Sequence, residues 1–341
     1  GKEYCIFTGD TLFIGDVGRP EGAIKSNVTK DDLAGMLFDS LRNKIMTLPD
    51  DVIVYPAHGA GSSCGKSMSK ETFDTLGHQK HVNYALQNIS KEEFIKQVTE
   101  GLLPAPQYFS KNAMLNKHGA GNMEEVYEQG LHKLSAQEFE AAAEETNALI
   151  LDTRDAQVFS KAFIPNSINI GLNGQFAVWV GTLITDLNQP ILLVCDEGKA
   201  EECIMRLARV GYDNTLGYLD GGIDAWKAAC KQVHTIASVS ADEFAAQYSG
   251  NTNVLDVRRP AEFETEHVVG AENKPLDFIN EWTNEADRTK TYFIHCAGGY
   301  RSMVAASILK ARGFENIVEV AGGYGAIAKT AVPKTNLVHA K

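Results

Sequence analysis

The sequence predicts an α/β protein in which two similar parallel-sheet domains follow a different N-terminal domain. Short apolar segments typical of buried strands alternate with helical stretches such as Ser302–Arg312, which predicts mostly parallel sheets covered by helices on both faces. The pattern also repeats, because Asp152 and Asp256 are 104 residues apart and Cys195 and Cys296 are 101 residues apart. Intervals of this size indicate tandem domains rather than a solenoid.

A cysteine lies at the end of an apolar strand in the last domain. The strand Tyr292–Cys296 leads into the glycine-rich turn Ala297–Arg301, and a helical stretch is expected from Met303 onward. Amides of such a turn form an anion cradle, and the helix dipole and a nearby arginine favour a thiolate. We therefore predict that Cys296 is a nucleophile, the alternative being a buried structural cysteine. His295 is expected to pack in the strand rather than act as a base.

The loop from Cys296 to Arg301 resembles the active-site loop of rhodaneses, the single-cysteine sulfurtransferases. Four residues separate the two side chains, whereas the related cysteine-based phosphatases and arsenate reductases have one residue more and a wider loop. A smaller ring suits the outer sulfur of thiosulfate or of a persulfide better than a phosphate. The strand Val254–Arg258 also agrees with the family, and the resemblance spans about residues 235–329.

The resemblance implies roles for individual residues. Cys296 would take the outer sulfur of a donor and hold it as a persulfide, while Arg301 and the loop amides hold the departing anion. The substrate-binding loop is expected to comprise Ala297, Gly298, Gly299, Tyr300 and Ser302. Tyr300 is expected at the pocket mouth, and Asp256 and Arg258 are expected to orient the loop and the helix ends rather than take part in the chemistry.

The upstream copy carries a different loop, with the sequence CDEGKA at residues 195–200. Ala200 stands where the later copy has Arg301, and two carboxylates follow the thiol directly. Like charges disfavour a thiolate and repel an anionic donor. We therefore predict that Cys195 is not a working nucleophile, and that this domain is a spacer or docking surface. The alternative is a second active site in which Lys199 compensates for the missing arginine.

Two motifs in the N-terminal third place a metal-binding side chain directly after an apolar strand. Phe7–Pro20 contains Asp10, and Val54–Gly61 contains His58. Carboxylate and imidazole groups suit zinc or iron. The motifs resemble the later metal-binding motifs of the metallo-β-lactamase fold, in which the equivalents of Asp10 and His58 bind metal.

A metal site formed by Asp10 and His58 would need further ligands. The superfamily's His-x-His-x-Asp-His cluster lies upstream of these motifs, and an open catalytic site has about three protein ligands. We therefore expect only the C-terminal part of a metallo-β-lactamase-like αββα domain, in a chain that starts at Gly1 and is a fragment. The domain order resembles fusion proteins whose first domain is similar to persulfide dioxygenases, which use one Fe(II), or to glyoxalase-II-type hydrolases. In the dioxygenase pattern the Asp10 position binds iron, and the His58 position is not a primary ligand.

Domain boundaries follow from the repeat and from local composition. Residues 1–130 are assigned to the metallo-β-lactamase-like part, 131–233 to a rhodanese-like domain without activity, and 234–341 to an active rhodanese domain. The polar, glycine-rich segment 116–122 is expected to link the first two domains.

The composition excludes several classes of function. The 341 residues are 44% hydrophobic with a net charge of −12, which argues against nucleic acids and anionic membranes as partners. No apolar run reaches the roughly 20 residues of a membrane helix. Six cysteines without a C-x-x-C pair fit a reducing compartment, so we expect a cytoplasmic protein that could form a homo-oligomer. Trp179 and Trp226 are expected to anchor hydrophobic cores.

Three functions remain open. The first is sulfur transfer through Cys296 from thiosulfate or glutathione persulfide to a thiol or cyanide, which needs no cofactor. The second is a metal-dependent persulfide dioxygenase or thioester hydrolase, using Fe(II) or zinc, with the rhodanese domains as accessories. The third is a non-enzymatic module that carries or binds sulfur.

Overall fold

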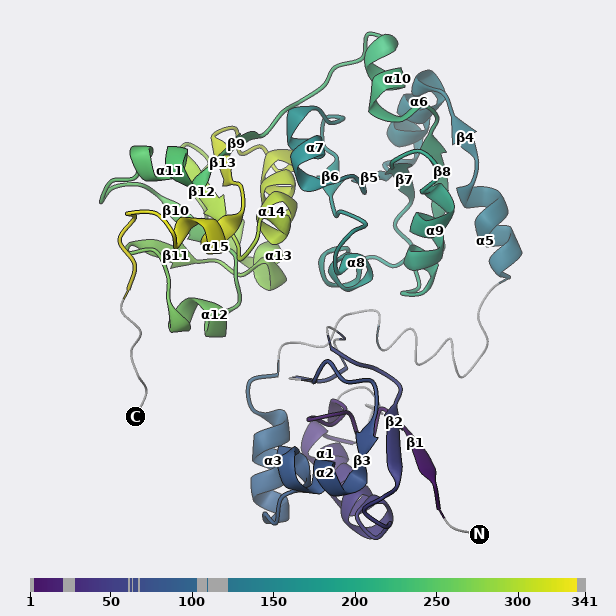
Figure 1. Ribbon diagram of the computed structural model, residues 1–341. Helices are drawn as coiled ribbons and strands as arrows, with labels where there is room; N and C mark the ends of the chain where they lie inside the picture. Colours follow the sequence, from purple (N-terminus) through teal and green to yellow (C-terminus); the bar gives the residue numbers. More distant parts are fainter. Residues whose placement is uncertain are drawn as a thin grey trace. The chain divides into compact units, whose positions relative to one another are not determined.

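The structure, a computed structural model, describes residues 3–20, 28–60, 62, 64–66, 68–102, 109 and 122–335. The chain forms two compact units, Gly1–Ala120 and Gly121–Lys341, and each is described by itself (Figure 1). The predicted link at 116–122 lies, apart from Asn122, outside the described residues, as does Gly61. Within these ranges, every helix is too short or too polar to span a bilayer.

The first unit combines a small sheet with a group of helices. Strands β1 (Cys5–Gly9), β2 (Ile53–Pro56) and β3 (Asp74–Thr75) lie side by side in this order, with β1 and β2 parallel and β2 and β3 antiparallel. Its helical segments are α1 (Lys30–Ser40), η2 (Leu41–Ile45), α2 (Leu76–Val82), η3 (Tyr84–Leu86) and α3 (Lys91–Thr99). Ile6 and Val54 pack with the helices in one core. Neighbouring strand residues face the opposite side, where Phe7 stacks on Tyr55 and is 80% exposed.

The second unit begins with a parallel sheet of five strands in the order β4-β8-β7-β5-β6. These strands are β4 (Lys133–Leu134), β5 (Leu149–Asp152), β6 (Ile168–Asn169), β7 (Ile191–Val194) and β8 (Thr215–Leu219). The accompanying helices are α5 (Met123–Gly130), α6 (Ala136–Thr146), α7 (Ala156–Lys161), α8 (Phe176–Leu183), α9 (Ala200–Ala208) and α10 (Gly222–Ala228). We call this part, from α5 to α10, the first repeat.

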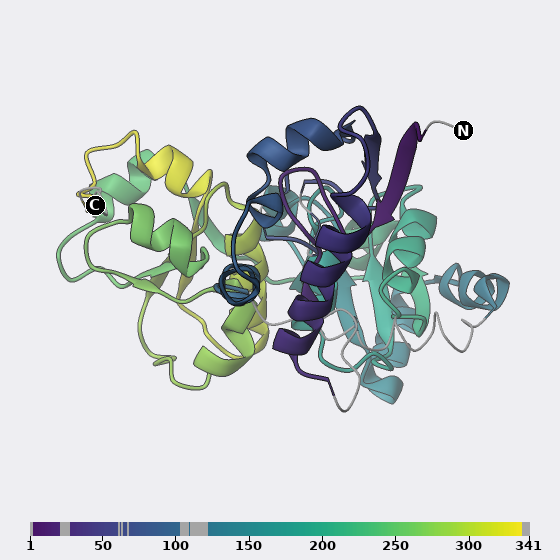
Figure 2. The same ribbon diagram turned by 90° about the horizontal axis from the view of Figure 1, so that it is seen from below.

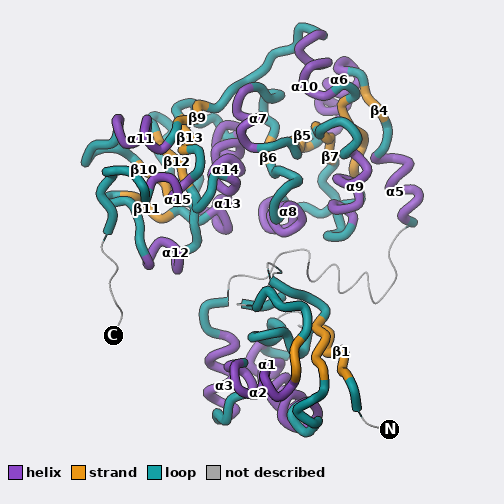
Figure 3. Tube along the Cα trace, viewed as in Figure 1, coloured by secondary structure: helices purple, strands orange, loops and turns teal. Residues whose placement is uncertain are grey.

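A second parallel sheet of five strands follows, in the order β11-β10-β12-β13-β9. Its strands are β9 (Ala237–Val239), β10 (Val254–Asp256), β11 (Ala271–Asn273), β12 (Tyr292–His295) and β13 (Ile317–Val320). Its helices are α11 (Ala241–Gln247), α12 (Pro260–Thr265), η4 (Leu276–Phe278), α13 (Ile279–Trp282), α14 (Tyr300–Ala311) and α15 (Gly323–Ile327). This part, from β9 to α15, is the second repeat. The predicted α/β class and the tandem parallel sheets are confirmed, with helices around the strands of each repeat (Figure 3).

Helix α5 belongs to the second compact unit. An added Cβ at Gly130 would lie 2.9 Å from Cδ1 of Ile204 on α9, so the two helices pack closely. The junction between the compact units therefore lies before α5, at Ala120, whereas the sequence places a domain boundary near residue 130.

The two repeats pack against each other through α7 and β6 of the first and α14 of the second, and they lie side by side in both views (Figures 1 and 2). The Asn169 N–H donates a hydrogen bond to Oγ of buried Ser307 at 2.9 Å, and the Ile236 N–H donates to the Ser160 carbonyl at 2.9 Å. These hydrogen bonds tie the backbone of the first repeat to Ser307 on α14 and to the residue directly before β9, so they help to hold the two repeats together.

Each repeat contains a buried ion pair at the carboxyl end of its sheet. Asp152 pairs with Arg154, and Asp256 pairs with Arg258, each at 2.6 Å with both side chains at most 6% exposed. Each arginine also donates to the carbonyl of a residue eight positions further along. The arginine therefore ties the strand end to the end of the following helix, as the sequence predicted for the second repeat.

We predict that Asp256→Ala lowers the free energy of unfolding by about 3–5 kcal/mol, because it leaves the Arg258 charge buried without its partner. Asp39→Ala breaks the exposed pair with Lys91 and should cost no more than about 1 kcal/mol. Denaturant unfolding followed by circular dichroism measures both changes. Equal, small effects of the two substitutions would contradict this view of the buried pair.

Candidate active site

Cys296 lies in the loop between β12 and α14, at the carboxyl end of the second sheet. Its side chain is buried, and the Gly299 N–H donates a hydrogen bond to its Sγ at 3.1 Å. Gly299 has a φ of 102° and caps α14, a conformation that residues with a side chain rarely adopt. The helix consequently begins at Tyr300, earlier than the predicted Met303, and the amide that precedes it contacts the sulfur directly.

The loop rests on the glycine turn between β13 and α15. The Tyr324 N–H donates to the Cys296 carbonyl at 2.6 Å, and the Gly325 N–H donates to the Ala297 carbonyl at 3.0 Å. Gly323 has a φ of 56°, and a Cβ at this position would lie 2.4 Å from the Cys296 carbonyl oxygen. Only glycine fits this approach, so the turn sets the position of the thiol.

Arg301 is held in place by a carboxylate that the sequence analysis did not single out. Its Nη1 and Nη2 atoms donate to the two carboxylate oxygens of Glu262 at 2.7 and 2.8 Å. Burial alone would lower the pKa of Arg301, but the hydrogen bonds and charge of Glu262 raise it above its ordinary value. Burial likewise acts to raise the pKa of Glu262, and Arg301 outweighs it, so that this pKa is lowered. The pair is therefore ionised and places a fixed cation beside the loop.

A cavity of about 400 Å³ is lined by Cys296, and both repeats contribute to its walls. The second repeat contributes Arg259, Cys296, Gly298, Tyr300 and Arg301, and the first repeat contributes Asn173, Gly174, Gln175 and Trp179. The Tyr300 hydroxyl donates to the Gly171 carbonyl of the first repeat at 2.7 Å. The tyrosine ring lies so close to Gly174 that a Cβ there would be 2.4 Å from its Cε2 atom. The first repeat thus forms one wall of the cavity.

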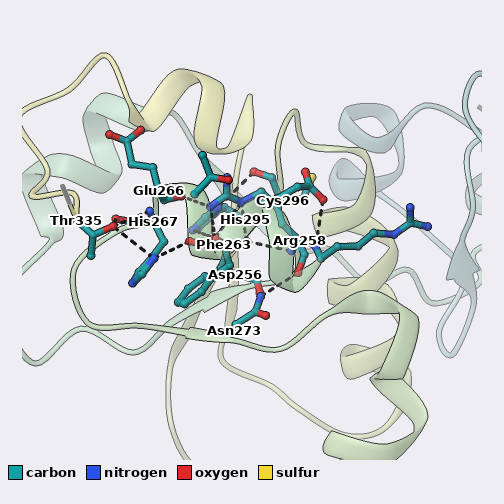
Figure 4. A network of polar contacts seen from close by, with 12 residues as sticks. Asp256, Arg258, Phe263, Glu266, His267, Asn273, His295, Cys296 and Thr335 are labelled. Carbon is teal, nitrogen blue, oxygen red and sulfur yellow. Dashed lines mark hydrogen bonds and ion pairs between the residues drawn. The ribbon is translucent and has the colours of Figure 1, made fainter. Parts of the chain in front are cut away.

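A polar network behind the loop joins Asp256 and Arg258 to the strand that carries the cysteine (Figure 4). His295 is completely buried, its Nδ1 lies 3.3 Å from the Cys296 carbonyl oxygen, and its Nε2 lies 3.7 Å from Asp256 Oδ2. Burial lowers the pKa of His295, which favours the neutral ring. The Arg258 guanidinium packs over the Tyr324 ring at 4.1 Å. These contacts support the backbone of the loop and do not reach the sulfur.

The equivalent loop of the first repeat has different surroundings. Cys195 is buried, and the Lys199 ammonium pairs with Glu202 at 2.9 Å. The hydrogen bond to Cys203, burial, and the charges of Asp152 and Asp196 all raise the pKa of Cys195. The thiol form is therefore favoured here, and the lysine that could compensate for the missing arginine is engaged elsewhere.

Asp10 and His58 meet in the first unit. The Asp10 Oδ1 and His58 Nδ1 atoms are 2.7 Å apart, and one ligand atom each of Asp10, His58 and Cys64 lies within 4.8 Å of the others. A carboxylate, an imidazole and a thiol fit a single zinc or iron ion. Cys64 was not predicted as a metal ligand. Its only hint in the sequence is its position in the glycine- and serine-rich segment that follows His58.

A model of the rhodanese-like domain matches residues 135–229 and 240–330, which is more than half of the chain. The chain belongs to the rhodanese family. Its relatives include the uncharacterized protein YqhL of Bacillus subtilis, which is 33% identical over 93 residues, 27% of this chain and 73% of that protein. Thiosulfate sulfurtransferase 16, chloroplastic, of Arabidopsis thaliana is 32% identical over 91 residues, 23% of this chain and 76% of that protein.

Two further likenesses are to proteins named as a persulfide dioxygenase and as a metallo-β-lactamase. Persulfide dioxygenase ETHE1, mitochondrial, of Homo sapiens is 34% identical over 101 residues, 30% of this chain and 34% of that protein. A crystal structure of a metallo-β-lactamase from Staphylococcus aureus gives a TM-score of 0.55 at 28% identity, covering 63% of this chain and 59% of that one. Together with the rhodanese match, these likenesses identify a fusion of a metallo-β-lactamase-like segment with two rhodanese domains, as predicted.

The second rhodanese domain brings the predicted loop residues together. Gly298, Tyr300 and Arg301 line the cavity with Cys296, and the Ser302 Oγ lies 3.6 Å from the Cys296 Sγ. The backbone of Ala297 holds the loop to the glycine turn, as described above. The wall that the first rhodanese domain supplies was not predicted from the sequence. Trp179 is buried as expected of a core anchor, but its side chain also lines the cavity.

We predict that Gly323→Ala displaces the Cys296 loop, because the new Cβ would collide with loop backbone atoms. The expected cost is about 1–3 kcal/mol in stability, together with a changed rate of Cys296 alkylation by iodoacetamide. Gly222→Ala is the matched control: it has a similar φ of 57° at the equivalent turn of the first rhodanese domain, but its Cβ would lie 3.7 Å from the Cys195 carbonyl oxygen. Thermal unfolding and intact-mass measurement compare the two, and equal behaviour would contradict the packing argument.

Proposed function

We propose that this protein is a sulfurtransferase in which Cys296 carries sulfur as a persulfide. The observation that carries the proposal is the contact between the Cys296 Sγ and the Gly299 amide, in a cavity that also holds Arg301. The family membership of the chain supports sulfur transfer as the class of activity.

The reaction has two half-reactions. The Cys296 thiolate attacks the outer sulfur of the donor, a new S–S bond forms, and the donor's S–S bond breaks with its electron pair leaving on sulfite or on a thiolate. An acceptor thiolate or cyanide then attacks the sulfur held on Cys296, and the Cys296 thiolate leaves. The loop amide and the fixed Arg301 cation stabilise negative charge in both steps.

The cavity favours a donor larger than thiosulfate. Its volume of about 400 Å³ lies within the range of small-molecule pockets, and Arg259 and Arg301 both line it. Glutathione persulfide would place its outer sulfur at Cys296 and a carboxylate near an arginine. Thiosulfate would use the same sulfur position with less of the cavity filled.

The first test is intact-mass spectrometry after incubation with glutathione persulfide or thiosulfate. The wild type and Cys195→Ser should gain the mass of one sulfur atom, and Cys296→Ser should gain none, because reactivity follows thiolate character. A gain of one sulfur atom by Cys296→Ser, or no gain by the wild type, would contradict the proposal. Loading without turnover when a thiol acceptor is added would point instead to a sulfur-carrying module.

We predict that Arg301→Lys slows sulfur transfer on the order of tenfold or more, because lysine cannot reproduce the paired hydrogen bonds to Glu262. Arg209→Lys is the control. Arg209 follows the C-terminal end of α9 and does not line the cavity, so this substitution should leave the rate unchanged. Steady-state kinetics with one donor at several concentrations measure both. A rate for Arg301→Lys equal to that of the control would remove Arg301 from the mechanism.

The cluster of Asp10, His58 and Cys64 supports a second candidate function, metal binding in the first unit. Asp10 and His58, with Cys64 as a further ligand, would hold a zinc or Fe(II) ion, which when bound would supply Lewis-acid or oxygen chemistry for a persulfide dioxygenase or thioester hydrolase. Metal analysis of the purified protein should find an ion in the wild type and at least tenfold less in Asp10→Asn. Equal metal content in both would contradict a role for Asp10.

A further inference from the structure

A buried carboxyl group that the proposed reaction does not use lies one side chain away from Cys296. Glu319, on β13, is 0% exposed. The Ser302 Oγ lies 2.9 Å from Glu319 Oε1 and 3.6 Å from the Cys296 Sγ. The three side chains therefore form a continuous path from an interior carboxyl group to the reactive sulfur.

The surroundings of Glu319 contain no charged partner among the side chains that contact it in the described residues. Its Oε2 accepts hydrogen bonds from the Ser238 hydroxyl at 2.7 Å and from Gln157 Nε2, in the first repeat, at 3.1 Å. Ile294 is its neighbour on β12. Through Ser302, Glu319 reaches Cys296, which interacts electrostatically with the Arg301 guanidinium at the start of α14. Burial raises the pKa of Glu319, and its hydrogen bonds offset this only in part.

The Ser302 hydroxyl can relay a proton between the two groups. It has one hydrogen, and its possible acceptors are the Gly299 carbonyl at 3.0 Å, Glu319 and Cys296. When Glu319 is ionised, Ser302 donates to it and accepts from the Cys296 thiol. When Glu319 is protonated, it donates to Ser302, whose hydrogen is then available to the Cys296 thiolate.

We propose that Cys296 and Glu319 share one proton through Ser302, so that Glu319 holds the thiol proton while Cys296 acts as a thiolate. The S–H bond of Cys296 breaks, its proton passes to Ser302 Oγ, and the Ser302 proton passes to the carboxylate. No net charge is created, and two negative charges are kept from occupying one buried site. Glu319 is a positioning residue that acts through Ser302. The inference rests on Cys296 as the reactive thiol of the proposed function.

The pH dependence of Cys296 alkylation by iodoacetamide tests this sharing. Peptide mass mapping separates Cys296 from the other cysteines. In the wild type the alkylation rate constant should rise in two steps, since a coupled pair ionises twice and the second ionisation removes the hydrogen bond to the thiolate. Glu319→Gln keeps the side-chain shape and an N–H donor for Ser302 but has no second ionisation, so its profile should show one step.

Two further variants make the test independent of one substitution. Ser302→Ala interrupts the relay and should also leave one step, which covers the case in which Glu319→Gln does not fold. Ser238→Ala is the control: it removes a hydrogen bond that lowers the pKa of Glu319 and leaves the relay intact. Its profile should keep two steps, with the second at higher pH.

Two steps in the profile of Glu319→Gln would overturn the proposal. An alkylation rate constant of Glu319→Gln that differs from the wild type by the same factor at every pH would also overturn it, because a merely structural role of Glu319 would give that result. The readout does not involve sulfur transfer. A two-step profile that becomes one step in a protein without transferase activity would therefore support the shared proton and reject the proposed function.

Discussion

The contact between the first rhodanese domain and the Cys296 loop is the interaction on which the rest of the site depends. The Tyr300 hydroxyl binds the Gly171 carbonyl, and the segment from Asn173 to Trp179 closes the cavity on that side. The same tyrosine is the first residue of α14, so this contact also fixes the helix whose N-terminus faces the thiol. A domain whose own loop lacks an arginine therefore contributes geometry to the site of its neighbour.

The charges of this site are set by their partners. Glu262 fixes Arg301 and Asp256 fixes Arg258, so that both guanidinium groups are held at defined positions. Glu319 has uncharged partners, one of which, Gln157, comes from the first rhodanese domain. Glu262 and Asp256 are thus paired with cations, whereas Glu319 is not. A buried carboxyl group without a cation nearby favours its neutral form.

Local patterns in the sequence were sufficient to predict the two parallel sheets, the repeat and the Cys296 loop, because apolar strands, glycine turns and helix starts are encoded by adjacent residues. The start of α14 was placed too late because the φ of 102° at Gly299 cannot be inferred from composition. The partners Glu262 of Arg301 and Gly171 of Tyr300 are 39 and 129 positions away. The first contact depends on how the second rhodanese domain folds and the second on how the two domains pack, and a single sequence carries no local signal for either.

The most direct test of a site shared between two domains changes only the first rhodanese domain. Asn173 and Gln175 are exposed and line the cavity, so Asn173→Ala combined with Gln175→Ala should fold normally. We predict that kcat/KM for sulfur loading from glutathione persulfide falls on the order of tenfold, about 1.4 kcal/mol of transition-state stabilisation, with an unchanged melting temperature. An unchanged kcat/KM would show that the second rhodanese domain works alone and would contradict a site shared between the two domains.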